Sequence, residues 1–293
     1  MRLGVVILPE HRWPAAHLLW QRAEELGFEH AWTYDHLAWR TLRDEPWFAA
    51  VPTLAAAALC TTRIRLGTLV ASPNFRHPVP FAKEVMTLDD LSGGRFVLGI
   101  GAGGPGWDAT MLGQEAMSLS ARADRFEEFV ELCDQLLRQP ATSYRGRVFA
   151  ADEARSVPGC VQTPRVPFAV AATASRGMRV AALHGQWWVT TGDPRARTPP
   201  TAEEGARVVA RQMDELEAAC AATGRDPQSI GRMVLTGPSL DQGLSSAEAL
   251  RDTIGRYAEI GVTDVVVHWP RPDGPYAGDR DRFEAVVSAV LAG

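Results

Sequence analysis

LSGGRFVLGIGAGG, residues 91–104, is a glycine-broken helix exit followed by an apolar strand that ends in further glycines. Glycine readily adopts the left-handed conformation that ends helices, and its missing side chain lets a backbone approach a flat ligand or a phosphate closely. The stretch therefore predicts a buried strand over residues 96–100 that opens onto a binding site at Gly101, Gly103 and Gly104. A glycine-rich turn that only reverses the chain is the alternative.

Short apolar runs alternate with helical patterns along the whole chain, as expected of repeated strand–helix units. Thr201 with Glu204, and Ser245 with Glu248, have capping-box spacing and predict two late helix starts. The predicted strands cover residues 3–8, 30–34, 64–70, 96–100, 167–171, 187–190, 233–236 and 264–268.

Eight strand–helix units in 293 residues predict a (β/α)8 TIM barrel, one domain over residues 1–293, with its site at the carboxyl ends of the strands. A doubly wound sheet is the alternative, but its glycine fingerprint usually follows the first strand, where this chain has Pro9-Glu10-His11. Residues 104–119 after the fourth strand and 140–165 before the fifth predict insertions, and 270–279 a third long loop. We expect all three at the site end of the barrel.

Composition narrows the class of protein. A net charge of −5 gives no basic stripe for nucleic acid, and no run of about twenty apolar residues predicts a membrane span. The apolar run at the amino terminus is too short for a signal peptide, so we expect a cytoplasmic protein. Cys60, Cys133, Cys160 and Cys220 lack metal-site spacing and predict reduced, mostly buried thiols. The histidines are scattered, so we expect no metal site.

Polar residues follow several predicted strands. Asp35 and His36 come after the second strand, where an imidazole beside a carboxylate suits general acid–base chemistry; a loop cap with a backbone-bonded histidine is the plainer interpretation. Arg76 follows the third strand and is suited to an anionic tail, or else it is a solvated side chain beside a helix that begins at Pro78.

The turn after the fifth strand, residues 173–177, combines hydroxyls, a guanidinium and a helix start. It predicts a phosphate site at Thr173, Ser175, Arg176 and Gly177, with an ordinary helix N-cap as the alternative. Trp39, Trp107 and Trp269 fall in loops at the same end of the barrel. They predict the walls of an apolar substrate pocket, although packing alone also explains a tryptophan.

Taken together, these segments resemble the bacterial luciferase-like flavin and deazaflavin oxidoreductases. The resemblance extends over nearly the whole chain, and joint occurrence of its segments in order is more specific than any one of them. It is carried by RHP (76–78), AKEVMTLDDLSGGRFVLGIGAGG (82–104), ARADRFEEFVELCDQLL (121–137), SYRG (143–146) and TPRVPFAVAATASRGMRVAALHGQWWV (163–189).

The resemblance implies a barrel that binds an isoalloxazine-type ring over its strand ends, with His36 as the proton-transfer residue beside Asp35. It further implies a non-prolyl cis peptide at Leu69-Val70 against the ring and Asn74 at the ring edge. Phosphate would bind at the turn that includes Ala172. There are departures: Asp108 is displaced from the usual acidic position by Gly104-Pro105, although it stays in the predicted substrate pocket, and Ala171-Ala172 replaces a glycine pair.

The leading hypothesis is an oxidoreductase that transfers a hydride between coenzyme F420 and a small organic substrate. The first alternative is an FMN-dependent monooxygenase that uses reduced flavin, supplied by a partner flavin reductase, and O2. The second is a barrel that binds a cofactor without catalysis. The resemblance also suggests a homodimer. Tryptophan-rich loops suggest an apolar or aromatic substrate, whereas Arg40, Arg43 and Arg271 on neighbouring loops equally suit an acid group or the anionic tail of the cofactor. The direction of hydride transfer stays open.

Overall fold

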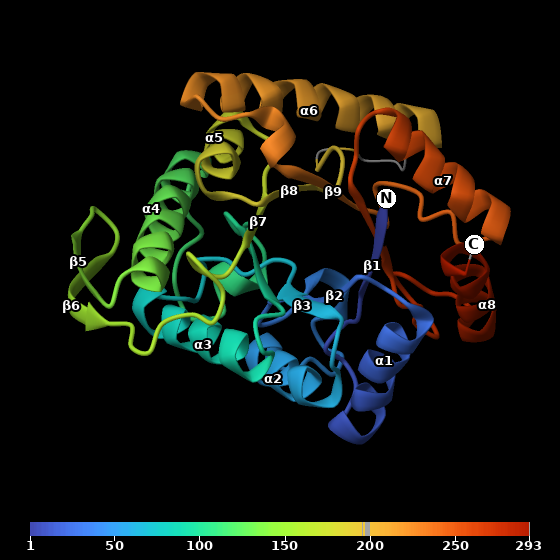
Figure 1. The fold of residues 1–293 in the computed structure, drawn as a ribbon, viewed down its shortest axis with the longest axis horizontal. Helices are drawn as coiled ribbons and strands as arrows, with labels where there is room; N and C mark the ends of the chain where they lie inside the picture. Colours follow the sequence, from blue (N-terminus) through green and yellow to red (C-terminus); the bar gives the residue numbers. More distant parts are fainter. Residues whose placement is uncertain (195, 197–199, 293) are drawn as a thin grey trace.

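The computed structural model describes residues 1–194, 196 and 200–292, and within these residues eight parallel strands close into a barrel surrounded by eight helices (Figure 1). The barrel strands are β1 (Arg2–Val6), β2 (His30–Thr33), β3 (Arg65–Thr68), β4 (Phe96–Gly101), β7 (Phe168–Ala171), β8 (Trp187–Thr190), β9 (Gly231–Leu235) and β10 (Asp264–His268). The helices are α1 (Trp13–Leu26), α2 (Ala50–Cys60), α3 (Pro78–Leu91), α4 (Leu119–Arg138), α5 (Ser175–His184), α6 (Ala202–Thr223), α7 (Ala247–Glu259) and α8 (Arg280–Leu291).

Around the ring the strand order is β1-β10-β9-β8-β7-β4-β3-β2. Each of the eight strands is followed by one helix, so the predicted (β/α)8 barrel is confirmed. Short 3-10 turns, η1 (Arg40–Leu42) and η2 (Trp107–Ala109), lie in the loops after β2 and β4, and η3 (Pro227–Ser229) precedes β9.

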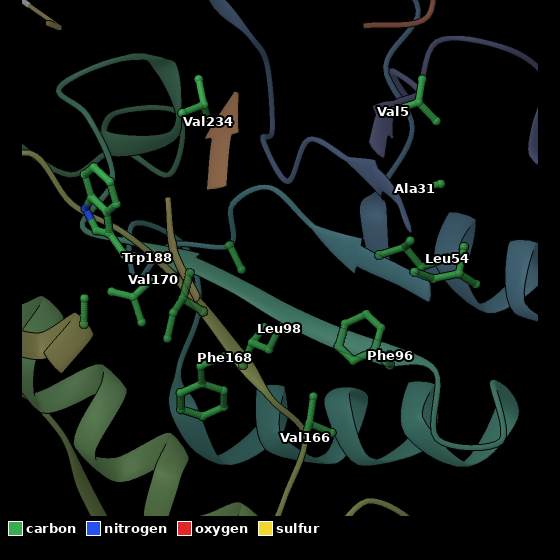
Figure 2. Close-up of a cluster of buried hydrophobic side chains, with 14 of the residues drawn as sticks. Val5, Ala31, Leu54, Phe96, Leu98, Val166, Phe168, Val170, Trp188 and Val234 are labelled. Atoms are coloured by element: carbon green, nitrogen blue, oxygen red, sulfur yellow. The ribbon is translucent and has the colours of Figure 1, made fainter. Parts of the chain in front are cut away.

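Alternation along each strand divides the core into two layers. Phe96, Leu98 and Ile100 of β4 belong to the cluster between strands and helices, whereas Val97 belongs to the cluster inside the barrel. Figure 2 shows the outer layer, where Leu98 and Phe168 from neighbouring strands lie close together. In FVLGIG, therefore, Phe96, Leu98 and Ile100 point outward, and the inward positions are Val97 and then two glycines, Gly99 and Gly101.

The predicted insertion at 140–165 contains a β-hairpin, β5 (Ala141–Arg145) and β6 (Ala150–Arg155), outside α4 (Figure 1). It joins the end of α4 to the segment before β7, so its base lies at the end of the barrel opposite the strand carboxyl ends. The expectation that this segment lies at the site end is therefore wrong for its base. The turn of the segment, however, reaches back along α4, where Arg147 lies 3.6 Å from Asp124 and the Phe149 ring lies 5.4 Å from that of His77 before α3. Its polar, largely exposed strands carry little apolar alternation, which is why the sequence predicted a loop.

The two predicted helix starts differ in outcome. Thr201 forms the expected capping box with Glu204 at the start of α6. The second was wrong by one residue, because Ser246 is the N-cap of α7 and its hydroxyl accepts a hydrogen bond from the Ala249 backbone N–H at 3.1 Å. Glu248 then stands too early in the helix to complete a box with the cap.

Two further expectations concern the cysteines and the membrane. All four cysteines are free thiols, of which Cys133 and Cys220 are buried and Cys60 and Cys160 half-buried. Burial raises the pKa of each thiol, so the neutral form dominates near pH 7. No helix within the described ranges is both long and apolar enough to cross a bilayer.

A buried polar chain occupies the amino-terminal end of the barrel. The Asp264 carboxylate is fully buried and lies 3.1 Å from His30 Nε2 and 2.7 Å from Arg2 Nε. Trp32 Nε1 donates to His30 Nδ1 at 2.7 Å, so the His30 proton lies on Nε2 and points at Asp264. Burial raises the pKa of the Asp264 carboxyl, but the bonds from His30 and Arg2 outweigh it and lower the pKa to about 2.

The hydrogen bonds of Asp264 predict that its contribution to the free energy of unfolding depends on pH. The folded pKa of Asp264 lies below its ordinary value, so its contribution is complete above pH 3.8 and is lost as the pH falls from 3.8 to about 2. We expect Asp264→Asn to lower the free energy of unfolding by about 3 kcal/mol at neutral pH. Urea unfolding across this pH range should show the deficit shrinking, with the exposed Asp252→Asn on α7 as control. A deficit that does not change with pH would contradict the assignment.

Candidate active site

The carboxyl ends of the strands bring most of the predicted site residues to one mouth of the barrel. The loops after β2, β3, β4 and β7 supply them, as expected for this fold. Among the described residues, no cluster of His, Cys, Asp and Glu has the arrangement of a metal site.

His36 is paired with Asp108 across the β2 and β4 loops. The Asp108 carboxylate contacts His36 Nδ1 directly, and its other oxygen accepts the Leu37 backbone N–H at 2.6 Å. Asp108 is buried and His36 is partly exposed. Because a carboxylate can only accept, it holds the His36 proton on Nδ1 and leaves Nε2 free as a base. The extra Gly104-Pro105 thus does not keep Asp108 away from His36.

Asp35 has a different partner from the one the sequence suggested. Its two carboxylate oxygens accept bidentate bonds from Arg76 at 2.7 Å each, and Arg76 also donates to Glu84 on α3 at 2.8 Å. Asp35 is buried at 2 % exposure. The predicted Asp35–His36 pair is therefore corrected to Asp108–His36. Two carboxylates balance the Arg76 charge and occupy three of its five N–H donors, which disfavours the predicted role in binding an anionic tail.

The glycines after β4 form a side-chain-free wall against the β3 loop. A Cβ at Gly101 would lie 2.7 Å from Val70 Cγ2, and one at Gly103, where φ is +72°, would lie 2.7 Å from the Asn74 amide. The Asn74 amide in turn donates to the exposed Gly104 carbonyl at 3.1 Å. The Leu69–Val70 peptide bond beside this wall is cis, as predicted.

Two arginines of α4, missed in the sequence, point into this wall. Arg125 is buried and donates to the Asn74 side chain, and Arg122 donates to the Gly103 carbonyl at 2.8 Å. The Nε atoms of both are buried without a hydrogen-bond partner among the described residues. Burial, and then the charge of Arg122, lower the pKa of Arg125. Two crowded cations with orphaned donors form a site suited to an anion.

The predicted phosphate turn lies beside these arginines at the start of α5. The first helical amides, those of Ser175, Arg176 and Gly177, have no acceptor inside the helix, and Ala174 at the N-cap supplies no side chain to satisfy them. Thr173 is half-buried and Ala172 is buried. A side chain at position 177 would clash with Ala172, because a Cβ added to Gly177 would lie 2.9 Å from the Ala172 Cβ.

The Arg176 side chain does not point freely at the turn. It forms ion pairs with Glu127 at 2.7 Å and Asp124 at 2.6 Å on α4, and these raise its pKa, Glu127 most. Its predicted role as a phosphate ligand therefore has less support than that of the amides. The same contacts hold the α5 start beside the first turns of α4.

The three predicted pocket tryptophans have separate positions. Trp39 is buried in the interior cluster and stacks on Tyr276 at 5.8 Å. Trp107 is 37 % exposed, with the Arg43 guanidinium 4.0 Å from its ring. Trp269 is not at the mouth: it packs on Phe283 of α8 at 5.1 Å, because the residue after His268 points toward the helices.

The sequence did not reveal a cluster of three neutral aromatic side chains, Tyr34, His268 and Tyr276. Tyr34 Oη lies 2.7 Å from His268 Nε2 and 3.0 Å from Tyr276 Oη. Burial lowers the pKa of His268 to about 3, against an opposing effect of the Thr236 backbone, so its ring is neutral. Tyr34 and His268 stand at or just past strand ends, and that position was the available signal. The mouth therefore has a charged wall at β2–β4 and a neutral wall at β10.

Comparison with known proteins finds a matching family model and several similar proteins. A family model described as luciferase-like monooxygenase matches residues 1–283. An uncharacterised protein of Mycobacterium tuberculosis is 31% identical over 234 residues, covering 79% of this chain and 71% of that protein. An F420-dependent glucose-6-phosphate dehydrogenase of Microbacterium testaceum is 27% identical over 271 residues, covering 90% of this chain and 66% of that enzyme.

One solved structure illustrates the shared fold. An F420-dependent secondary alcohol dehydrogenase, in complex with an F420–acetone adduct, superposes with a TM-score of 0.81 at 18% identity. The superposition covers 99% of this chain and 98% of that chain. At this identity the likeness concerns the barrel.

The His36–Asp108 pair predicts a tautomer that can be measured. In Asp108→Asn the amide oxygen keeps the Leu37 N–H, so the amide NH2 faces His36 Nδ1 and the ring proton moves to Nε2. We expect long-range proton–nitrogen NMR correlations to report Nδ1–H in the wild type and Nε2–H in the variant. Asp273→Asn, in the exposed loop before α8, is the control. The same tautomer in wild type and Asp108→Asn would contradict the assignment.

Proposed function

The chain belongs to the luciferase-like monooxygenase family, and from that premise we propose that it is an oxidoreductase transferring a hydride between coenzyme F420 and a small organic substrate. The observation that carries the proposal is the His36–Asp108 pair beside the side-chain-free wall at Gly101 and Gly103. A relative named as F420-dependent, aligned over 90% of this chain, supports the choice of cofactor.

The mouth fits an anionic cofactor with a flat ring. The orphaned Nε atoms of Arg122 and Arg125, with the first amides of α5, would hold its phosphate. The ring would lie over Leu69 and Val70, with Asn74 at its edge. When bound, the deazaflavin supplies a two-electron hydride acceptor or donor.

The chain's own residues would orient the substrate and move its proton. Asp108 fixes Nδ1–H of His36, so Nε2 can take a proton from a substrate hydroxyl or, once protonated, return it to a carbonyl. Buried Trp39 and Tyr34 limit the access of water on the other side. Asp35 and Arg76 would position the β2 and β3 loops through their ion pair rather than take part in proton transfer.

An FMN-dependent monooxygenase is the second candidate function. The family's description favours it, and FMN carries a phosphate that the same arginines would bind. In that case a flavin reductase would supply reduced flavin. A non-catalytic barrel, which the shifted Asp108 and the alanines at 171–172 would favour, has less support because Asp108 contacts His36 directly. Homodimer formation stays a prediction.

Cofactor binding separates these functions. We expect F420, followed by its fluorescence, to bind the wild type more tightly than FMN does. Arg122→Ala removes a charge-assisted contact and should weaken F420 about tenfold or more, while the deazaflavin riboside without phosphate binds unchanged. Arg207→Ala on the exposed face of α6 is the matched control. Tight binding of FMN without binding of F420 would contradict the proposed F420-dependent function.

Turnover tests the proton-transfer pair. With alcohols and carbonyl compounds as a substrate panel, bleaching or recovery of the oxidised deazaflavin absorbance reports hydride transfer. We expect His36→Ala and Asp108→Asn to bind F420 like the wild type but to lose about a hundredfold or more in kcat. Full turnover in His36→Ala with cofactor bound would show that the proposed chemistry is wrong even though the barrel is right.

A further inference from the structure

The neutral wall of the mouth consists of three aromatic side chains joined by two hydrogen bonds. Tyr276 Oη contacts Tyr34 Oη, and Tyr34 Oη contacts His268 Nε2. Tyr276 is only half-buried, whereas Tyr34 and His268 are buried. The chain of bonds therefore runs from a buried imidazole outward to a hydroxyl at the mouth, and the proton-transfer function assigned to His36 leaves it unused.

Packing holds these groups in fixed positions. The Tyr276 ring is stacked between His268, at 3.6 Å, and Trp39, at 5.8 Å. Arg40 and Tyr276 both have positive φ, +40° and +67°, in loops that meet through the Trp39–Tyr276 stack. Arg271 donates to Glu10 at 2.7 Å, and its backbone N–H donates to the Tyr276 carbonyl at 3.0 Å. Strained residues held by such contacts mark functional sites more often than ordinary packing.

The three groups stay uncharged. Burial raises the pKa of Tyr34 and of Tyr276 and lowers that of His268. Within the described residues, no carboxylate, lysine or arginine side chain forms a hydrogen bond with any of them. Arg40 acts on both tyrosines electrostatically, but its guanidinium lies over the Trp39 ring at 5.3 Å. The groups of this wall that can contact a ligand are therefore neutral hydroxyls and rings, with Arg40 as the neighbouring cation.

We propose that Tyr276 determines substrate specificity by binding the neutral oxygen of an apolar alcohol or ketone, with Tyr34 and His268 behind it. This deepens the proposed function, because an alcohol and its ketone are the two sides of a hydride transfer. The substrate would lie between Tyr276 and His36, with its apolar part against Trp39.

The hydrogen-bond chain can serve both sides of the reaction because its direction is reversible. A neutral imidazole carries its proton on either nitrogen. With the proton on Nδ1, Nε2 accepts from Tyr34, Tyr34 accepts from Tyr276, and Tyr276 can accept from an alcohol. With the proton on Nε2, each bond reverses and Tyr276 donates to a ketone. His268 Nδ1 has no hydrogen bond of normal geometry among the described residues, so neither tautomer is locked; the Thr236 backbone, which raises the pKa of the ring, favours the proton on Nδ1 and thus the direction that accepts from an alcohol.

Ligand-observed NMR on the purified protein tests this with cyclohexanol, cyclohexanone and cyclohexanecarboxylate as probes. We expect the wild type to bind the alcohol and the ketone but to bind the carboxylate more weakly. Tyr276→Phe keeps the ring stack and should weaken both neutral probes about threefold to tenfold, and Tyr34→Phe should weaken them in the same direction. Tyr144→Phe is the control, because the Tyr144 hydroxyl lies on the outer hairpin and donates to Glu131 of α4 at 3.3 Å.

Each outcome bears on the proposal. Neutral probes that do not bind the wild type, a carboxylate that binds as well, or Tyr276→Phe that binds like the wild type would each overturn it. A loss confined to the alcohol or to the ketone would overturn the reversible direction of the chain. Because no cofactor or turnover is needed, a protein that binds these probes but not F420 would contradict the proposed function and leave the substrate subsite standing.

Discussion

Parallel pairing of β1 with β10 closes the sheet through five register pairs, from Arg2↔Asp264 to Val6↔His268. At the amino-terminal end, closure brings the buried Asp264 carboxylate beside the buried His30 ring and the partly exposed Arg2 guanidinium. At the carboxyl end it brings His268 beside the β2 end, so that Tyr34 can bond to it. One closed ladder therefore supplies a stabilising polar chain at one end of the barrel and the neutral wall of the site at the other.

The mouth of the barrel has a side with charged groups and a side with neutral aromatic groups. The β4 loop contributes Asp108 and α4 contributes Arg122 and Arg125, and these lie against backbone groups and the Asn74 amide of the β3 loop. The neutral side combines Tyr34 after β2, His268 at the end of β10 and Tyr276 in the loop that follows, and among the described residues the two hydroxyls bond to each other and to the neutral imidazole. A ligand that spans the mouth would thus need an anion at one side and an uncharged group at the other.

Sequence reasoning found the barrel because outward apolar residues recur with period two in FVLGIG and in the other strands. It missed the outer hairpin, whose residues are mostly polar on both faces. Arg122 and Arg125 lie in a helix whose apolar spacing indicates packing, so nothing local marks their side chains as buried donors. The Tyr34–His268 bond joins residues 234 positions apart, and only the closed barrel brings them together.

Asp35 and His36 show why neighbours in sequence can have separate roles in a site. Successive side chains at a strand end point to opposite sides. The Asp35 carboxylate therefore points toward Arg76 and α3, and the next side chain, the His36 imidazole, points into the mouth. Asp35 accordingly bonds to Arg76 and His36 to Asp108. The partner that fixes the His36 tautomer must then come from another strand's loop. The β4 loop provides it because its side-chain-free glycines let the chain cross close to the β3 loop before it reaches Asp108.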